Sequence, residues 1–265
     1  MNLIVEENEE NTLLQKQLAD EAERKRLADE AEERKKLWHS VRAPIGTLKE
    51  RINQLIEDGK REGIDLRANA INEMAKVGNS MMTPIHVAAM YSTPEHINLL
   101  LKHGADINIL SSEHKTPMLS ACSFGNENNA IHLMKLGCKH LGLVDTFGYC
   151  GLHYAFFNGR EMFNLAKLIL KEGENIHARE KYGKTPAHIA AHFGKASSLR
   201  FLRDHGADLT MTSTEGWTTI HSACAGRVKS EEHQLVLNML LQEGRFFILL
   251  IRTFFLSFSF LFTHS

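Results

Sequence analysis

The sequence predicts an all-α fold, a solenoid of helix-turn-helix repeats with short hairpin loops, preceded by a charged N-terminal helix. Three observations predict it. One heptapeptide pattern recurs along the chain, a second pattern recurs in step with it, and residues typical of helix starts and ends flank both. Two short helices cannot bury their apolar faces alone, so such units are stable only when they stack on one another.

The first pattern opens five units. It begins at Thr83 (TPIHVAA), Thr116 (TPMLSAC), Cys150 (CGLHYAF), Thr185 (TPAHIAA) and Thr218 (TTIHSAC), and successive starts lie 33, 34, 35 and 33 residues apart. We number these units 1 to 5. A second pattern keeps the same period, as HGADIN from 103, LGCKHL from 136, EGENIH from 172 and HGADLT from 205. A period of this length indicates a repeat array.

The chemistry of unit 4 explains both patterns. Thr185 can cap a helix with its hydroxyl, and Pro186 suits the first helical position because a backbone N–H there has no partner inside the helix. Leu199 and Leu202 follow at helical spacing, and Gly206 suits the left-handed conformation that ends a helix. Each unit is therefore predicted to form a helix, a turn, a second helix and an extended loop.

These units resemble ankyrin repeats, whose pattern is close to T-P-L-H-x-A-A followed by L-L-x-x-G-A-D, over about residues 78–244. The resemblance implies that each motif His bonds to the capping Thr and to the loop of the adjoining unit. The structural residues are then Thr83, His86, Thr116, His153, Thr185, His188, Thr218 and His221. A ladder of metal sites is the alternative, but packed helices lie about 10 Å apart, whereas zinc lies about 2 Å from each ligand. No metal or other cofactor is expected.

Three departures from the pattern carry expectations. Leu119 replaces the motif His in unit 2, and Cys150-Gly151 replaces Thr-Pro in unit 3, which loses the hydroxyl cap. Unit 3 is also longer between its two helices, so the centre of the stack is expected to be its weaker joint. In unit 5, RVKSEEH (227–233) is expected to bulge between the helices.

The chain divides into four segments by composition. Residues 1–43 are a charged helical segment, 44–82 a degenerate first repeat or N-terminal cap, 83–244 the repeats, and 245–265 an apolar tail. The charged helix has no single apolar stripe, so a coiled coil is disfavoured. We expect a solvated helix that acts as a spacer, and self-association through it is the alternative. Leu37 and Trp38 are expected to dock it onto the stack.

The tail 245–265 leaves two hypotheses open. Residues 246–262 could be a membrane anchor, although Arg252 near its middle opposes insertion. The favoured hypothesis is a non-native or truncation product, because the tail interrupts a repeat and holds seven of the 14 Phe.

Composition and motifs exclude several functions. The net charge of -1 gives no general reason to bind nucleic acid, and no nucleophile elbow, phosphate loop or metalloprotease motif indicates an enzyme. The four cysteines are predicted to be reduced, buried thiols, and the acidic N-terminus is unlike a secretory signal. We expect a cytoplasmic or nuclear monomer.

Aromatic residues recur at positions that face the groove in ankyrin-like units. The loop tips carry Phe147, Tyr149, Tyr182 and Trp217, and the first-helix ends carry Tyr91, Phe124, Phe157 and Phe193. These are predicted to bind a partner, although the helix-end rings could instead cover the next repeat. The tip charges, Asp145 and Glu180 among them, are predicted to be a solvated rim, and a mildly basic centre favouring an acidic peptide is the alternative.

The sequence therefore predicts a protein-protein interaction adaptor that binds a partner of unknown identity. Two alternatives remain, a scaffold tethered to a membrane by 246–262 and a fragment of a larger ankyrin-containing enzyme or channel.

Overall fold

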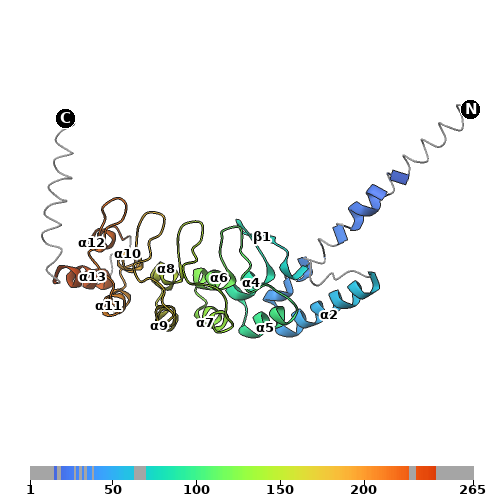
Figure 1. Ribbon diagram of the computed structural model, residues 1–265, viewed down its shortest axis with the longest axis horizontal. Helices are drawn as coiled ribbons and strands as arrows, with labels where there is room; N and C mark the ends of the chain where they lie inside the picture. The colour runs from blue at the N-terminus through green and yellow to red at the C-terminus, as the bar shows by residue number, and fades with distance from the viewer. Residues whose placement is uncertain are drawn as a thin grey trace, which may run out of the picture.

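Two parallel rows of helices form the body of the protein in the computed structural model, which describes residues 39–62, 70–226 and 231–242 and short pieces between 15 and 37 (Figure 1). The first row is α4 (Pro84–Tyr91), α6 (Pro117–Phe124), α8 (Gly151–Phe156), α10 (Pro186–His192) and α12 (Thr219–Cys224). The second row is α5 (Pro94–Lys102), α7 (Glu127–Lys135), α9 (Phe163–Lys171), α11 (Ala196–Asp204) and α13 (Glu231–Gln242). The predicted all-α repeat solenoid is confirmed.

Small residues let neighbouring first-row helices approach one another. An alanine stands five residues after the start of each unit, and these five side chains are at most 2% exposed: Ala88, Ala121, Ala155, Ala190 and Ala223. Helix α4 packs on α6, α6 on α8, α8 on α10 and α10 on α12. One apolar core therefore runs through the whole array, and each unit covers the core of its neighbours.

The loops before each unit project from the same side of the array as hairpins with five-residue tips (Figure 1). The tips are 111–115, 145–149, 180–184 and 213–217. The N–H of the second residue of each tip donates to a carbonyl of the preceding hairpin: Ser112 to Met81 at 2.9 Å, Thr146 to Glu113 at 3.1 Å, Lys181 to Phe147 at 2.9 Å and Thr214 to Tyr182 at 3.0 Å. This ladder holds the tips in one register.

The N-terminal end of the array is covered by α2 (Ile45–Glu62), which packs against α5. A short antiparallel hairpin of β1 (Ala75–Val77) and β2 (Ser80–Met82) then leads into unit 1. This arrangement is compatible with the degenerate repeat or cap predicted for 44–82, and the division of the chain into segments stays a prediction.

The segment before α2 docks onto unit 1. Leu37 is fully buried, as predicted, and the Nε2 of His96 lies 2.9 Å from the carbonyl oxygen of Ala43. Trp38 and the tail 245–265 lie outside the described residues. So do 227–230 of the predicted bulge, while 231–233 form the first turn of α13.

The extra length of unit 3 forms a separate turn, η1 (Phe157–Gly159), between α8 and α9. At the start of α8, a Cβ added to Gly151 would lie 2.8 Å from Cδ1 of Ile169. A proline ring would need the same space, so proline at this position would require the Ile169 side chain to move.

Candidate functional site

The motif histidines join successive units through hydrogen bonds. The Nδ1 of His188 accepts the backbone N–H of Thr185 at 3.2 Å and lies 2.9 Å from the Thr185 hydroxyl. Its Nε2 lies 2.9 Å from the carbonyl oxygen of Trp217 in the next loop tip. Because a carbonyl only accepts, the ring carries its proton on Nε2.

The same arrangement recurs in two other units. The Nε2 of His86 lies 2.9 Å from the Lys115 carbonyl oxygen, and that of His153 lies 3.1 Å from the Lys184 carbonyl oxygen. Burial lowers the pKa of His86 and of His153 from 6.5 to about 4, and it also lowers the pKa of His188 and His221. The neutral rings of His86, His153 and His188 therefore have a structural role, because both nitrogens of each ring are hydrogen-bonded and one of the bonds joins two units.

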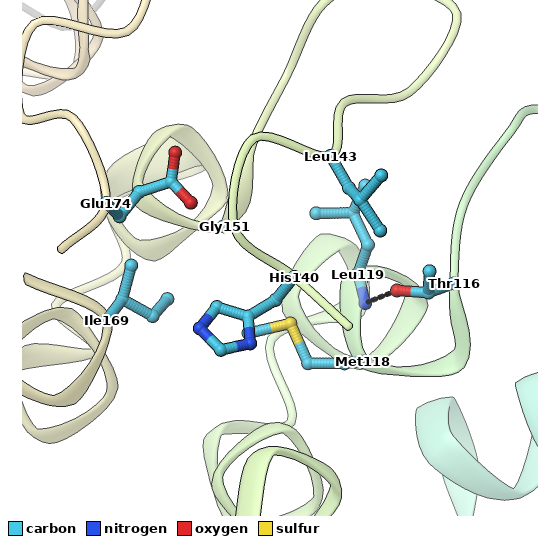
Figure 2. A pocket seen from close by; sticks show the side chains of 8 residues that line it. All are labelled: Thr116, Met118, Leu119, His140, Leu143, Gly151, Ile169 and Glu174. Atoms are coloured by element: carbon cyan, nitrogen blue, oxygen red, sulfur yellow. Dashed lines mark hydrogen bonds between the residues drawn. The ribbon is translucent and has the colours of Figure 1, made fainter. Parts of the chain in front are cut away.

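Units 2 and 3 depart from the motif, and the first helix of each is capped in a different way. In unit 2 the Thr116 hydroxyl accepts the N–H of Leu119 at 3.2 Å, the bond drawn in Figure 2. In unit 3 the Cys150 thiol lies 3.1 Å from Nδ1 of His153 and takes the place of the missing hydroxyl. Burial raises the pKa of Cys150 to about 12, which keeps it a thiol at neutral pH.

The prediction of buried thiols is confirmed for Cys122, Cys138 and Cys150 and is wrong for Cys224, which is exposed. The residue at the same place in each of units 1 to 4 is fully buried, and each of those units has a following unit stacked on it, whereas Cys224 belongs to the last unit that the structure describes.

Most of the predicted aromatic residues are accessible. Phe147, Tyr182 and Trp217 on the tips are 54%, 53% and 37% exposed, and Tyr91 and Phe124 on the helix ends are both 43% exposed. Tyr149, Phe157 and Phe193 are half-buried.

The structure brings four of these rings into one cavity of about 450 Å³, within the range of ligand-binding pockets. We call it the aromatic cavity. Its ring-bearing wall consists of Phe124, Phe147, Tyr149, Tyr154 and Phe157, and the rest is Val77, Asn79, Ser80, Met82, Met90, Glu113, Lys115 and Ser123. It therefore spans the β1–β2 hairpin and units 1 to 3.

The other predicted rings lie outside the aromatic cavity. Tyr91 packs on Phe124 with 4.3 Å between ring centroids, and Phe193 packs on Phe157 at 5.2 Å. These helix-end rings thus cover one another across neighbouring units, as the alternative expected, while keeping part of their surface accessible. Tyr182 and Trp217 lie on later tips, beyond the cavity.

A buried carboxylate organises the tip beside the cavity. Asp145 is 4% exposed, and its Oδ1 accepts the N–H groups of Phe147 and Tyr149, both at 2.9 Å. Glu180 is 5% exposed and accepts the N–H groups of Tyr182 and Lys184, both at 3.0 Å. The prediction that these two acids are a solvated rim is wrong, because each folds back to satisfy its own tip.

Sequence reasoning named four of the 13 residues that line the cavity and missed nine, among them Tyr154, Lys115 and Glu113. The Tyr154 hydroxyl donates to Oδ2 of Asp145, and Nζ of Lys115 lies 2.8 Å from Oε2 of Glu113 and 4.0 Å from Oδ2 of Asp145. One signal was available for Tyr154. It stands directly after the motif His, where no other unit has an aromatic residue.

A narrow hollow at the joint of units 2 and 3 has a different character (Figure 2). His140 and Glu174 line it, at positions where other units have apolar residues, such as Ile176 for His140 and Ala207 for Glu174. The Nε2 of His140 lies 3.1 Å from Oε2 of Glu172. The hollow has no room for a water-sized molecule, so it is a packing feature and not a ligand site.

Within the residues that the structure describes, no group of three or more His, Cys, Asp or Glu side chains could hold a metal ion. None of the helices in that part of the chain has both the length and the apolar character needed to cross a membrane.

Comparison with known families agrees with this geometry. The sequence profile described as ankyrin repeats (3 copies) matches residues 46–145 and 152–247, which is most of the chain. The chain belongs to the ankyrin-repeat family. Ankyrin repeats are binding modules, so protein partners are the expected ligands of this array.

Individual relatives share the ankyrin region. The transient receptor potential cation channel subfamily A member 1 homolog of Caenorhabditis elegans is 28% identical over 159 residues. The subfamily A member 1 channels of Drosophila melanogaster and Homo sapiens are 31% identical over 138 residues and 27% identical over 205 residues. These alignments cover 60%, 48% and 63% of this chain but only 13%, 11% and 18% of the channels. The ankyrin repeat protein OPG189 of Variola virus is 28% identical over 92 residues, 35% of this chain and 16% of the viral protein.

Proposed function

We propose that this ankyrin array is a protein-binding adaptor whose central contact site is the aromatic cavity. The observation that carries the proposal is the meeting of rings from successive units around one open space of about 450 Å³. Phe147 and Phe124 are 54% and 43% exposed, and accessible aromatic residues beside a pocket are the usual anchors of a protein interface.

The tip ladder supports this role. The backbone bond from Lys181 to Phe147 fixes the tip that carries Phe147 against the next tip. Asp145 fixes the same tip from within. A site built on such a rigid scaffold loses little conformational entropy when a partner binds.

Binding without catalysis is part of the proposal. The motif histidines are neutral and engaged in bonds between units, and the Cys150 thiol has a raised pKa, so none of them is activated as a base or nucleophile.

Affinity capture with matched variants tests the proposal. The Phe124→Ala/Phe147→Ala double variant removes two rings of the cavity, whereas Leu235→Ala/Leu241→Ala removes two exposed apolar side chains from α13. We expect the first variant to lose specific proteins that the intact chain and the second variant both retain. Equal retention by all three would remove the cavity from the interface.

The channel relatives favour a second candidate, that the array is the ankyrin portion of a larger channel protein. Immunoblotting of native tissue with an antibody against units 1–5 tests it. A single product of about the mass of this chain, 30.0 kDa, would contradict it. The membrane-tether alternative concerns residues outside the described part and is tested by fractionation with and without 245–265.

A further inference from the structure

Two carboxylates and one ammonium stand at the wall of the aromatic cavity: Glu113 and Lys115 line it, and the buried Asp145 lies behind Lys115. The Lys115 ammonium serves two carboxylates, that of Glu113 at 2.8 Å and that of Asp145 at 4.0 Å. The Asp145 side chain is wholly buried, whereas 31% of the Glu113 side chain is exposed. One ammonium between two carboxylates leaves a formal charge of -1, and Glu113 is the carboxylate that a ligand can reach.

The pKa values of Tyr149 and Tyr154 are raised by burial and also by the negative charges near the cavity. Burial raises the pKa of Tyr149, and the charges of Glu180 and Asp145 raise it further. Burial also raises the pKa of Tyr154, together with its bond to Asp145 and the charge of Glu113. Both shifts agree with a negative potential on this side of the groove.

A further cation, Arg160, is directed elsewhere. Its Nη1 donates to the carbonyl oxygens of Cys122 at 3.1 Å and Ser123 at 2.6 Å, at the C-terminal end of α6. A helix end of this kind carries partial negative charge, which holds the guanidinium there. Arg160 is not among the residues that line the cavity.

Rings along the groove already accept cations from the chain itself. The guanidinium carbon of Arg42 lies 4.2 Å from the ring centroid of Tyr91, and Nζ of Lys184 lies 5.8 Å from that of Trp217. Phe147 offers a comparable face and is the most exposed ring of the cavity. A desolvated cation over such a face is attracted by the ring quadrupole.

We propose that the aromatic cavity receives a basic side chain, lysine or arginine, from a linear segment of the protein partner. The apolar stem packs against Met90 and the rings, and the cation binds the Glu113 carboxylate and the face of Phe147. An acidic side chain would meet the Glu113 carboxylate and would also be repelled by the buried charge of Asp145. An uncharged apolar side chain would take water from Glu113 without replacing its hydrogen bonds. This inference rests on the proposed function, because it names the partner chemistry of the same site.

Titration with blocked amino acids tests it without a known partner. The probes are acetyl-arginine amide, acetyl-norleucine amide and acetyl-glutamate amide, added to the full chain while the backbone amide signals of Lys115, Phe147 and Tyr149 are followed by NMR. We expect the arginine probe to bind in the millimolar range and shift these signals. The norleucine probe should bind several-fold more weakly, and the glutamate probe should leave them unmoved.

Two variants separate the charge from the ring. Glu113→Gln keeps an acceptor for Lys115 and removes the charge, so the arginine probe should bind about threefold to fivefold more weakly. Glu215→Gln is the matched control, because Glu215 holds the third place on tip 213–217 as Glu113 does on tip 111–115, and it should change nothing. Phe147→Leu should weaken binding of the arginine probe and spare that of the norleucine probe.

Several results would overturn the inference: no binding of the arginine probe, norleucine binding as tight as arginine binding, or equal losses in Glu113→Gln and Glu215→Gln. None of these results would affect the outcome of the affinity-capture experiment, which tests the adaptor function separately. If the cavity variant still loses its partners while the arginine probe fails, the adaptor function stands and the charge preference is wrong.

Discussion

The Nε2 of His188 lies 2.9 Å from the carbonyl oxygen of Trp217, and this bond connects the start of α10 to the tip of the next hairpin. His188 is fully buried, and its Nδ1 is occupied by the N–H of Thr185. One side chain therefore satisfies backbone groups of two units. Comparable bonds at His86 and His153 make the histidines part of the interface between units and not only of the helix start.

Replacing His188 by leucine should destabilise the array by about 1–3 kcal/mol, because the substitution leaves buried polar groups of Thr185 and Trp217 without their partner. Leucine is a suitable probe, since Leu119 occupies the same place in unit 2. Urea denaturation measures the change. His205→Leu is the control: its exposed ring bonds the Phe201 carbonyl of its own unit, at 2.7 Å, so the substitution should cost less than His188→Leu. Similar losses in both variants would contradict the structural role.

Acid should weaken the array through these histidines. The pKa of His86 and His153 falls from 6.5 to about 4 on folding, so the unfolded chain binds more protons between these pH values. Their contribution to stability is complete above pH 6.5 and is lost as the pH falls through about 4. Denaturation midpoints measured across this range should rise with pH and then level off. The His86→Leu variant should show a shallower rise, and an unchanged slope would refute the assignment.

Local chemistry explains why so much of the fold could be predicted. Thr185, Pro186 and His188 act within one helical turn, so their pattern is enough to place the start of α10. The aromatic cavity could be predicted only in part. Its rings recur at fixed offsets, but the pairing of Asp145 with Tyr154 depends on how the tip folds back against α8. The sequence shows that Asp145 and Glu180 are charged, but their burial depends on how each loop tip packs and could not be predicted from the pattern.

Gly148 should tolerate alanine less well than Gly216 does. Both have a positive φ, +83° and +76°, which costs alanine about 1–2 kcal/mol. A Cβ on Gly148 would also lie 2.8 Å from the backbone nitrogen of Lys181, the donor of a ladder bond, whereas nothing lies within 4 Å of one on Gly216. We expect a larger loss of unfolding free energy for Gly148→Ala and faster hydrogen exchange at the Lys181 amide. Equal effects of the two substitutions would show that the tips are not in close contact.

Glu174, which lies where units 2 and 3 meet, should lower the free energy of unfolding of the array at neutral pH. Burial raises the pKa of Glu174, which is 9% exposed, so the folded state favours the protonated form. The favourable contribution of that proton is present below the ordinary pKa near 4.5 and is lost as the pH rises through the raised value.

Glu174→Gln should therefore stabilise the array at pH 7 and have little effect below pH 4. Glutamine keeps an acceptor for the Gly142 N–H, which lies 3.3 Å from Oε2 of Glu174, so the hydrogen bond is not the variable. Glu172→Gln is the control. Its carboxylate is 3.1 Å from His140 and 41% exposed, so its removal should bring no gain. Thermal unfolding at both pH values measures the difference. A loss of stability in Glu174→Gln at pH 7 would mean that the attraction of His140 for the charged carboxylate outweighs the cost of burying it.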